Sequence, residues 1–171
     1  MRSARWLLLL TMVACAQTPP PPDPDECAVW RRELSFAMSV ENHDANAFAS
    51  HLDPGAVFGA GTESPIRGRD AVLKAWAGLI AGGDTRLRWR PRYVSIGADR
   101  NIAFSQGPFV LEDKRPDGTP RFRVGTFSSV WIRRAGKWVV LFDGGATPAE
   151  VKDAQAAEAH LVSAPAACPS R

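Results

Sequence analysis

The clearest pattern of apolar and polar positions runs through residues 121–145. Residues 121–133 alternate, which predicts a β-strand with two distinct faces. One face carries Phe122, Val124, Thr126, Ser128, Val130 and Ile132, and the other carries Arg121, Arg123, Gly125, Phe127, Ser129, Trp131 and Arg133. Residues 134–137, Arg-Ala-Gly-Lys, predict a tight turn into a return strand over residues 138–143. The return strand is apolar on both faces, so we expect it to be covered on both sides.

The return strand ends at an acid, Asp143, which two glycines follow. A carboxylate at the end of a buried strand needs hydrogen-bond partners or a function. The functional interpretation is a catalytic base or a ligand anchor. The structural interpretation is a carboxylate that accepts hydrogen bonds from nearby backbone N–H groups. Both interpretations stay open from the sequence.

The remaining pattern predicts an α+β fold. Helical spacing of apolar residues predicts helices over residues 24–41, 45–52, 69–81 and 148–161, and alternation predicts further strands over residues 56–61, 87–97 and 102–112. The first helix is expected to bury Cys27, Trp30, Leu34, Ala37, Met38 and Glu41. We therefore expect three N-terminal helices on one face of a strongly curved, mixed or antiparallel sheet, with an extra C-terminal helix and a cavity between the layers.

The first residues have the layout of an export signal. Arg2 and Arg5 precede a short apolar run, which is too short to span a bilayer. The run ends in Met12-Val13-Ala14-Cys15, which resembles a bacterial lipobox, whose cysteine is lipidated and becomes the mature N-terminus. Ala at position 16 implies, by analogy with such lipoproteins, the periplasmic face of the outer membrane. The alternative is an ordinary cleaved signal and a soluble periplasmic protein.

These features divide the chain into four parts. Residues 1–14 are the signal, and residues 15–25 are the lipidated Cys15 and a proline-rich tether. Residues 26–145 form the folded domain, and residues 146–171 form the C-terminal helix and tail. We expect the membrane to be contacted only through the N-terminal lipid.

Charge and cysteine content limit the classes of partner. The formal charge of +3 falls to +1 when Arg2 and Arg5 leave with the signal, because 19 basic and 18 acidic residues remain. The balance therefore gives no reason to expect nucleic acid as a partner. No Cys and His cluster has metal-ligand spacing, and we expect neither a metal nor a cofactor. Cys27 and Cys168 lie near the two ends of the folded part, so a disulfide between them is a reasonable hypothesis.

Three local patterns, in this order, resemble the NTF2-like superfamily of SnoaL-like proteins, ketosteroid isomerases and DUF4440 domains. They are residues 42–48 (NHDANAF), 65–72 (PIRGRDAV) and 130–138 (VWIRRAGKW), and the resemblance covers residues 26–145. It implies a cone-shaped α+β fold. Ketosteroid isomerases carry a catalytic carboxylate and a tyrosine at positions that correspond to Gly59 and Phe36 here. Because neither residue can transfer a proton, the resemblance does not imply that chemistry.

The candidate site residues follow from these elements. Asp143 and His51 are the candidate catalytic bases, His51 because it lies at the end of the second helix; a solvated histidine there is the structural alternative. The candidate ligand-binding residues are Trp76, Tyr93, Gln106, Phe127, Trp131 and Asp143. Aromatic side chains in a cone suit a planar apolar ligand, although most tryptophans belong to protein cores.

We expect a domain that binds a small apolar or amphipathic molecule without isomerase-type catalysis. One alternative is an enzyme, an isomerase, lyase or hydrolase, that uses Asp143 or His51 as base. The other is an assembly module of the cell envelope that forms a homodimer through the open face of its sheet.

Overall fold

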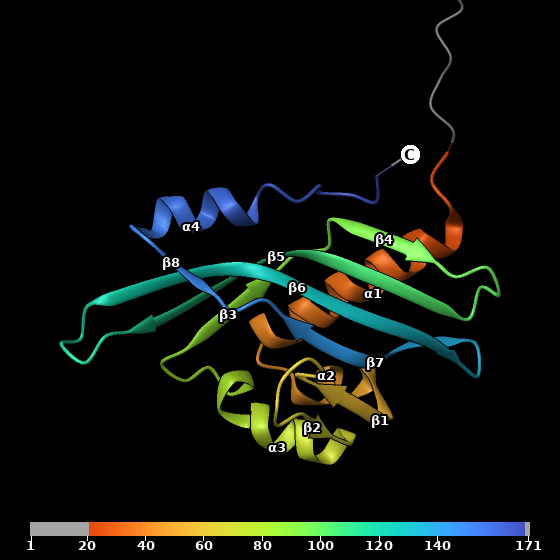
Figure 1. Ribbon diagram of the computed structural model, residues 1–171, viewed down its shortest axis with the longest axis horizontal. Helices are drawn as coiled ribbons and strands as arrows, with labels where there is room; N and C mark the ends of the chain where they lie inside the picture. Colours follow the sequence, from red (N-terminus) through yellow and green to blue (C-terminus); the bar gives the residue numbers. More distant parts are fainter. Residues whose placement is uncertain (1–20, 170–171) are drawn as a thin grey trace, which may run out of the picture.

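The computed structural model describes residues 21–169 and has helices packed on a single mixed sheet (Figure 1). The helices are α1 (Pro24–Glu41), α2 (Ala45–His51), α3 (Arg69–Ile80) and α4 (Ala154–Leu161). The strands are β1 (Leu52–Phe58), β2 (Ile66–Arg67), β3 (Arg86–Trp89), β4 (Tyr93–Ile96), β5 (Ile102–Lys114), β6 (Pro120–Arg134), β7 (Lys137–Gly145) and β8 (Ala149–Val151). The α+β class and the extra C-terminal helix are confirmed.

The sheet is built around the long strands β5 and β6. The strand order is β2-β1-β7-β6-β5-β3, with β4 also on β5 and β8 also on β6. All pairs are antiparallel except β1 and β7, which run parallel. The tight turn expected between β6 and β7 is present, with positive φ angles of 47° at Ala135 and 79° at Gly136.

The two faces of the sheet are covered by different helices. The alternation predicted for residues 121–133 is confirmed, because Phe127, Ser129 and Trp131 are all buried on one face, which we call the inner face. The inner face packs against α1 and the main core cluster. The outer face is covered in part by α4, where Leu161 packs against Val110 of β5.

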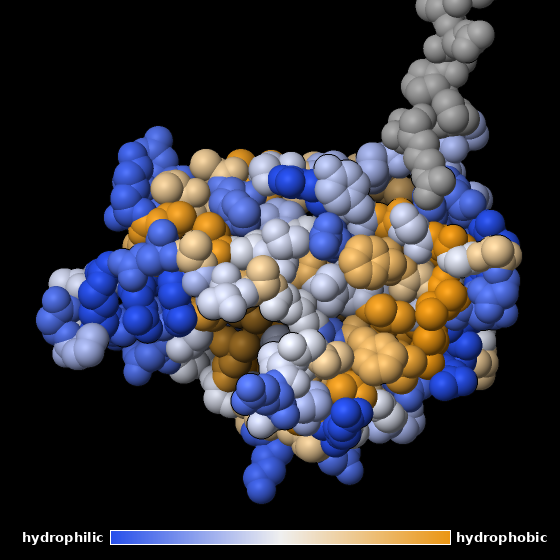
Figure 2. Space-filling view, in the orientation of Figure 1, coloured by the Kyte–Doolittle hydropathy of each residue, from blue (hydrophilic) through white to orange (hydrophobic). Residues whose placement is uncertain are grey.

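The outer face also carries exposed apolar side chains that α4 leaves open. Phe104, Ile102 and Phe142 are 42%, 45% and 39% exposed, and Figure 2 shows an apolar patch over this part of the sheet. The cover expected on both faces of β7 is therefore incomplete at Phe142. The homodimer expected through this face stays a prediction.

The single strand expected over residues 87–97 is two strands, β3 and β4, on either side of Pro91. Proline has no N–H for a sheet ladder, so the chain leaves the regular register there. The neighbours of Pro91 still donate to β5, Arg90 to the Pro108 carbonyl at 3.1 Å and Arg92 to the Gln106 carbonyl at 2.8 Å. Gly107 lies opposite, where a Cβ atom would come within 1.9 Å of the Arg90 carbonyl oxygen, so a side chain would block this crossing.

Two element boundaries differ from the expectation because of strand pairing. β1 begins at Leu52 instead of residue 56, since Pro54 and Gly55 form an irregularity inside the strand opposite β7 and not a turn before it. The last helix begins at Ala154, with Asp153 as N-cap, instead of residue 148. Residues 149–151 pair with β6 as β8, and this tertiary pairing overrides their helical preference.

The buried side of α1 matches the expected one in part, because Cys27, Trp30 and Ala37 are buried. Val29, Glu33, Phe36, Ala37 and Val40 are fully or almost fully buried. By contrast, Met38 is 38% exposed, and Leu34 and Glu41 are only half-buried. A glutamate therefore occupies the middle of the helix face that packs on the sheet.

A disulfide joins the two ends of the described domain. Cys27 of α1 bonds to Cys168 with a sequence separation of 141 residues, so the proposed pairing is present. Within residues 21–169, no helix combines the length and the apolar content that crossing a membrane requires. The signal, Cys15 and most of the tether lie outside the described residues.

Removing this disulfide should destabilise the fold. A closed loop of 141 residues restricts the unfolded chain, and native disulfides contribute about 2–4 kcal/mol. We expect Cys27→Ala/Cys168→Ala to lower the unfolding free energy in urea by that amount. The same loss should follow from reducing the wild-type protein, whereas reductant should leave the double variant unchanged. Equal stability of the oxidised and reduced wild type would contradict this expectation.

Candidate active site

A largely apolar cavity of about 430 Å³ lies between the inner face of the sheet and α3. In Figure 2 an apolar hollow is visible between the positions of β3 and α3 in Figure 1. The apolar side chains of its lining are Phe58, Ile66, Trp76, Leu87, Trp89, Phe109, Leu111 and Phe127. Asp143 is the single ionisable side chain of this lining. A cavity of this size suits a small organic ligand.

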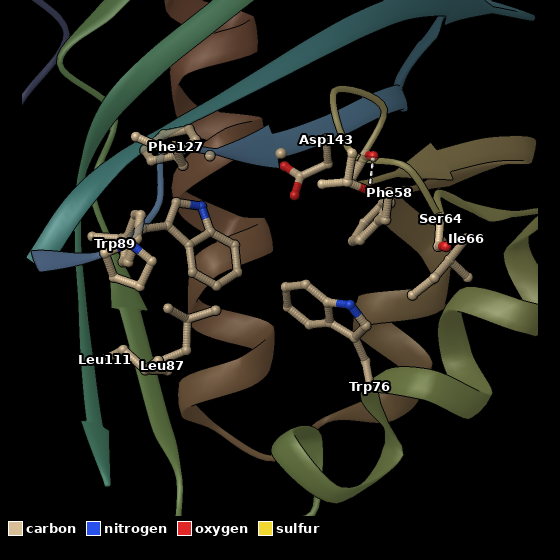
Figure 3. Close-up of a pocket in the computed structure, with 16 residues that line it drawn as sticks. Phe58, Ser64, Ile66, Trp76, Leu87, Trp89, Leu111, Phe127 and Asp143 are labelled. Carbon is tan, nitrogen blue, oxygen red and sulfur yellow. Dashed lines mark hydrogen bonds between the residues drawn. The ribbon is translucent and has the colours of Figure 1, made fainter. Parts of the chain in front are cut away.

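A β-bulge aims Asp143 into the cavity. In β7, Val140 lies opposite Trp131, but Phe142 lies opposite the next residue, Val130, so Leu141 has no partner. Trp138 and Val140 face the core. With regular alternation, the odd-numbered residues Val139, Leu141 and Asp143 would all face the outer side of the sheet. The extra residue reverses this parity, which is a common use of bulges beside functional sites. Figure 3 shows the carboxyl group of Asp143 directed into the space between the aromatic side chains.

The carboxyl group of Asp143 has one hydrogen bond within the described protein. The hydroxyl of Ser129, its cross-strand partner on β6, donates to Oδ2 at 2.8 Å. The residue is half-buried because its side chain borders the cavity, while protein encloses the carboxyl group. Burial and the negative charge of Glu33 raise the pKa of Asp143 to about 8, against the opposing effect of the Ser129 hydroxyl.

Glu33 is a second carboxyl group, fully buried behind the cavity wall. It projects from α1 and accepts hydrogen bonds from three strands of the sheet. Trp89 Nε1 of β3 donates to Oε1 at 2.7 Å, Trp131 Nε1 of β6 donates to Oε2 at 2.8 Å, and the Ser105 hydroxyl of β5 also donates to Oε2. Trp89 both binds Glu33 and lines the cavity, so it separates this acid from the ligand space.

No basic side chain among residues 21–169 forms an ion pair with Glu33. Burial raises the pKa of Glu33 above its ordinary value. The hydroxyl of Ser105, the indoles of Trp89 and Trp131 and the hydroxyl of Ser129 offset this rise only in part. Ser129 thus interacts with both acids. Two interacting buried carboxyl groups with displaced pKa values are a candidate functional site.

Three of the six residues expected to bind a ligand line the cavity: Trp76, Phe127 and Asp143. The other three do not. Tyr93 is 63% exposed, and Gln106 pairs with it on the outer face of β5. Trp131 is fully buried and contacts Glu33 instead. Asp143 has no hydrogen bond from a backbone N–H to its side chain, so the structural interpretation offered for it does not hold.

His51 belongs to the core, neither at the cavity nor in solvent. It is 1% exposed, its Nδ1 lies 2.6 Å from the Ala47 carbonyl oxygen, and its Nε2 lies 3.0 Å from the Ser35 hydroxyl. Burial, followed by the charge of Arg32, lowers the pKa of His51 to about 4. It is therefore neutral at neutral pH and not a candidate base for a ligand in the cavity.

The sequence contained a signal for Glu33 that the expected helix face missed. Val29, Phe36 and Val40 recur at helical spacing, and Glu33 falls within the same stripe. A charged residue inside an apolar stripe is a buried polar group that needs partners. Its partners come from strands 56 to 98 residues away, so spacing within the helix did not identify them.

Comparison with known families shows which family this chain belongs to. The family model described as a SnoaL-like domain matches residues 34–141, more than half of the sequence. The chain belongs to the SnoaL-like domain family. The match begins one residue after Glu33, covers the strands from β1 to the first part of β7, and ends two residues before Asp143. None of the curated proteins matches the sequence significantly.

Solved structures share the fold of this SnoaL-like domain at low sequence identity. A ketosteroid isomerase-like protein from Erwinia carotovora atroseptica is similar over 74% of this chain and 99% of its own, with 11% identity and a TM-score of 0.59. An NTF2-like protein with a cystatin-like fold from Novosphingobium aromaticivorans is similar over 80% and 88%, with 17% identity and a TM-score of 0.54. A conserved protein from Planctomyces limnophilus is similar over 74% and 98%, with 16% identity and a TM-score of 0.59.

The positions that the resemblance relates to isomerase catalysis have other roles in this SnoaL-like domain. Phe36 is 1% exposed and packs edge-on against Trp89 and Trp131. Gly59 has a φ of 66° and ends β1, where its N–H donates to the Asp143 carbonyl oxygen at 2.8 Å. Across residues 21–169, no group of three or more His, Cys, Asp or Glu side chains is arranged to hold a metal ion.

The raised pKa of Asp143 predicts a stability that falls with pH. Between the ordinary value of 3.8 and about 8, the native carboxyl group keeps a proton that the unfolded chain has lost. Its contribution is full below pH 3.8 and disappears as the pH rises through 8. His51 acts oppositely, but only below pH 6.5. We therefore expect the unfolding free energy to fall by about 1 kcal/mol per pH unit between pH 7 and 8.

Urea unfolding at several pH values measures this slope, with Asp143→Asn as the matched variant. The variant cannot ionise at this position, so its stability should stay nearly constant between pH 7 and 8. A wild-type slope that survives in Asp143→Asn would show that another group causes it.

Proposed function

We propose that this domain binds a small, mainly apolar molecule in the cavity and donates a hydrogen bond from Asp143 to an oxygen of that molecule. The observation that carries the proposal is one carboxyl group, kept neutral by burial and a second acid, at the end of an apolar cavity. A protonated carboxyl group has an O–H to donate, and an apolar site strengthens that bond. A ketone or another carbonyl compound fits these requirements.

The charge of the site supports a neutral ligand. The cavity lining includes no basic side chain, and Glu33 lies behind it as a second acid. An anionic ligand would lose its hydration and meet negative charge without a cation to pair with, which is unfavourable. Of two molecules with the same shape, the site would then favour the neutral one, because the negative charge of Glu33 repels an anion.

Acid–base catalysis at the same site is a second candidate function. A carboxyl group with a pKa near neutrality can both give and accept a proton at working pH. The specific observation in its favour is the pairing of Asp143 with a second acid through Ser129. Exchange of the α-hydrogens of a bound ketone for deuterium, lost in Asp143→Asn, would favour catalysis; no exchange would favour binding alone.

We also propose that the protein is exported and anchored by a lipid on Cys15. Support comes from the signal-like residues 1–14 and from the Cys27–Cys168 disulfide, which suits an oxidising compartment. The mass of the mature N-terminal peptide distinguishes an acylated Cys15 from an ordinary cleaved signal.

Two probes of the same shape test the proposed binding: 2-acetylnaphthalene, a ketone, and 2-naphthoate, an anion. We expect the ketone to bind at pH 7 and the carboxylate to bind at least tenfold more weakly. Affinity for the ketone should fall as the pH rises through about 8, where Asp143 loses its proton. Quenching of tryptophan fluorescence provides the measurement, because Trp76 and Trp89 line the cavity.

Two variants of Asp143 separate its hydrogen bond from its charge. Asp143→Asn still donates, so it should bind the ketone with an affinity that no longer changes between pH 7 and 9. Asp143→Leu cannot donate and should bind up to about tenfold more weakly, as expected for one lost hydrogen bond. Tyr93→Phe is the control, since Tyr93 lies outside the cavity. Equal affinity for the ketone and the carboxylate would contradict the proposal.

A further inference from the structure

We propose that Glu33 is a positioning residue that stays ionised and keeps the proton of the acid pair on Asp143. Its negative charge acts on Asp143 by electrostatic repulsion, next to the Ser129 hydroxyl that binds Asp143. This role of Glu33 rests on the proposed function, because the proton on Asp143 would face the ligand. The experiment that tests the role requires no ligand. Glu33 itself is fully buried and does not line the cavity, and Trp89, which does, donates a hydrogen bond to it.

The hydrogen bonds of Glu33 favour the ionised form. An indole N–H can only donate, and Trp89 and Trp131 direct one such group at each carboxyl oxygen. The Ser105 hydroxyl adds a third donor, at Oε2. A carboxylate accepts all three bonds, whereas a proton on Oε2 would compete with two donors already there. This set of donors therefore selects a charge on Glu33.

Asp143 has the opposite environment. Its carboxyl group accepts a single hydrogen bond, from Ser129, and otherwise meets the apolar cavity. Two nearby acids in a dry interior cannot both ionise cheaply, so the acid with fewer donors keeps the proton. Because Glu33 accepts three hydrogen bonds and Asp143 only one, the proton stays on Asp143.

Ser129 couples the two acids. It is fully buried on β6, directly opposite Asp143, where its hydroxyl donates to Asp143 Oδ2. The same hydroxyl also lowers the pKa of Glu33. The bulge at Leu141 creates this pairing, because it brings Asp143 and Ser129 to the same face of the sheet. Within residues 21–169, no other ionisable side chain lines the cavity or hydrogen-bonds to Glu33. Arg32 of α1 donates to the Trp138 carbonyl of β7 at 3.1 Å.

The purely structural explanation of Glu33 is a polar group that fixes the packing of α1 on the sheet. A buried carboxylate without a cation is costly for that purpose, and apolar residues in such positions are often as stable or more stable. A role in packing alone would leave the titration of Asp143 unchanged when the charge of Glu33 is removed. The titration of Asp143 therefore separates the two explanations.

The experiment follows the side-chain carboxyl carbons of the wild-type protein by ¹³C NMR between pH 4 and 10, with Asp143→Asn identifying the Asp143 signal. In the wild type we expect Glu33 to remain ionised at pH 7 and Asp143 to remain protonated. In Glu33→Gln we expect the titration midpoint of Asp143 to fall by about one pH unit or more, because the like charge is gone. The control Glu41→Gln removes a charge from the same helix, where Glu41 pairs with Arg90, and should leave the midpoint unchanged.

A second variant tests the coupling with the opposite sign. The Ser129 hydroxyl lowers the pKa of Asp143, so Ser129→Ala should raise the midpoint while Glu33→Gln lowers it. If Glu33→Gln does not fold, the wild-type titration alone still decides which acid holds the proton at pH 7. A protonated Glu33 beside an ionised Asp143, or an unchanged Asp143 midpoint in folded Glu33→Gln, would overturn the inference. Failure of both naphthalene probes to bind would not affect it.

Discussion

We assign a negative charge to the buried carboxyl group of Glu33, at the junction between α1 and the sheet, where no basic side chain of residues 21–169 pairs with it. Donors from β3, β5 and β6 all converge on Glu33, so this one carboxylate fixes the helix against three strands at once. Each donor is itself buried, and removing the acceptor would leave the Trp89 indole N–H without its partner and the Trp131 indole N–H with only the Ser105 hydroxyl, at 3.4 Å. The position of α1, and with it the inner wall of the domain, depends on this set of bonds.

The same charge determines what the cavity can recognise. The bulge at Leu141 turns Asp143 inward, Ser129 meets it across the strands, and Glu33 acts on it from behind. An aspartate in such a place becomes a neutral donor at neutral pH. Phe36 and Gly59, the positions that the resemblance relates to isomerase chemistry, cannot titrate, and the two acids lie elsewhere: Asp143 in the cavity lining and Glu33 behind it.

The sequence predicted the parts of the fold that depend on local pattern. The two faces of β6, the turn at Ala135 and Gly136, and the helices α2 and α3 follow from spacing and turn residues within a short stretch. The C-terminal helix was placed too early because Ala149–Val151 pair with β6, a contact more than twenty residues away. Local preference cannot reveal such a pairing.

The candidate site was only partly predictable for the same reason. Asp143 was found because an acid ends an apolar strand. The direction of its side chain depends on a bulge that the sequence of β7 does not predict. The interpretation of Trp131 as a ligand residue assumed that inner-face aromatic groups reach the cavity, whereas this one is used to bind Glu33. Glu33 could have been found from the sequence, because a charged residue within an apolar helical stripe must have hydrogen-bond partners on other elements.

Neutron diffraction from crystals of the protein, exchanged into D₂O at pH 7, locates the exchangeable hydrogens and so shows which of the two acids holds the proton. We expect deuterium on a carboxyl oxygen of Asp143, none on either oxygen of Glu33, and deuterium on the indole nitrogens of Trp89 and Trp131 directed at Glu33. Deuterium on Glu33 together with an ionised Asp143 would contradict this expectation.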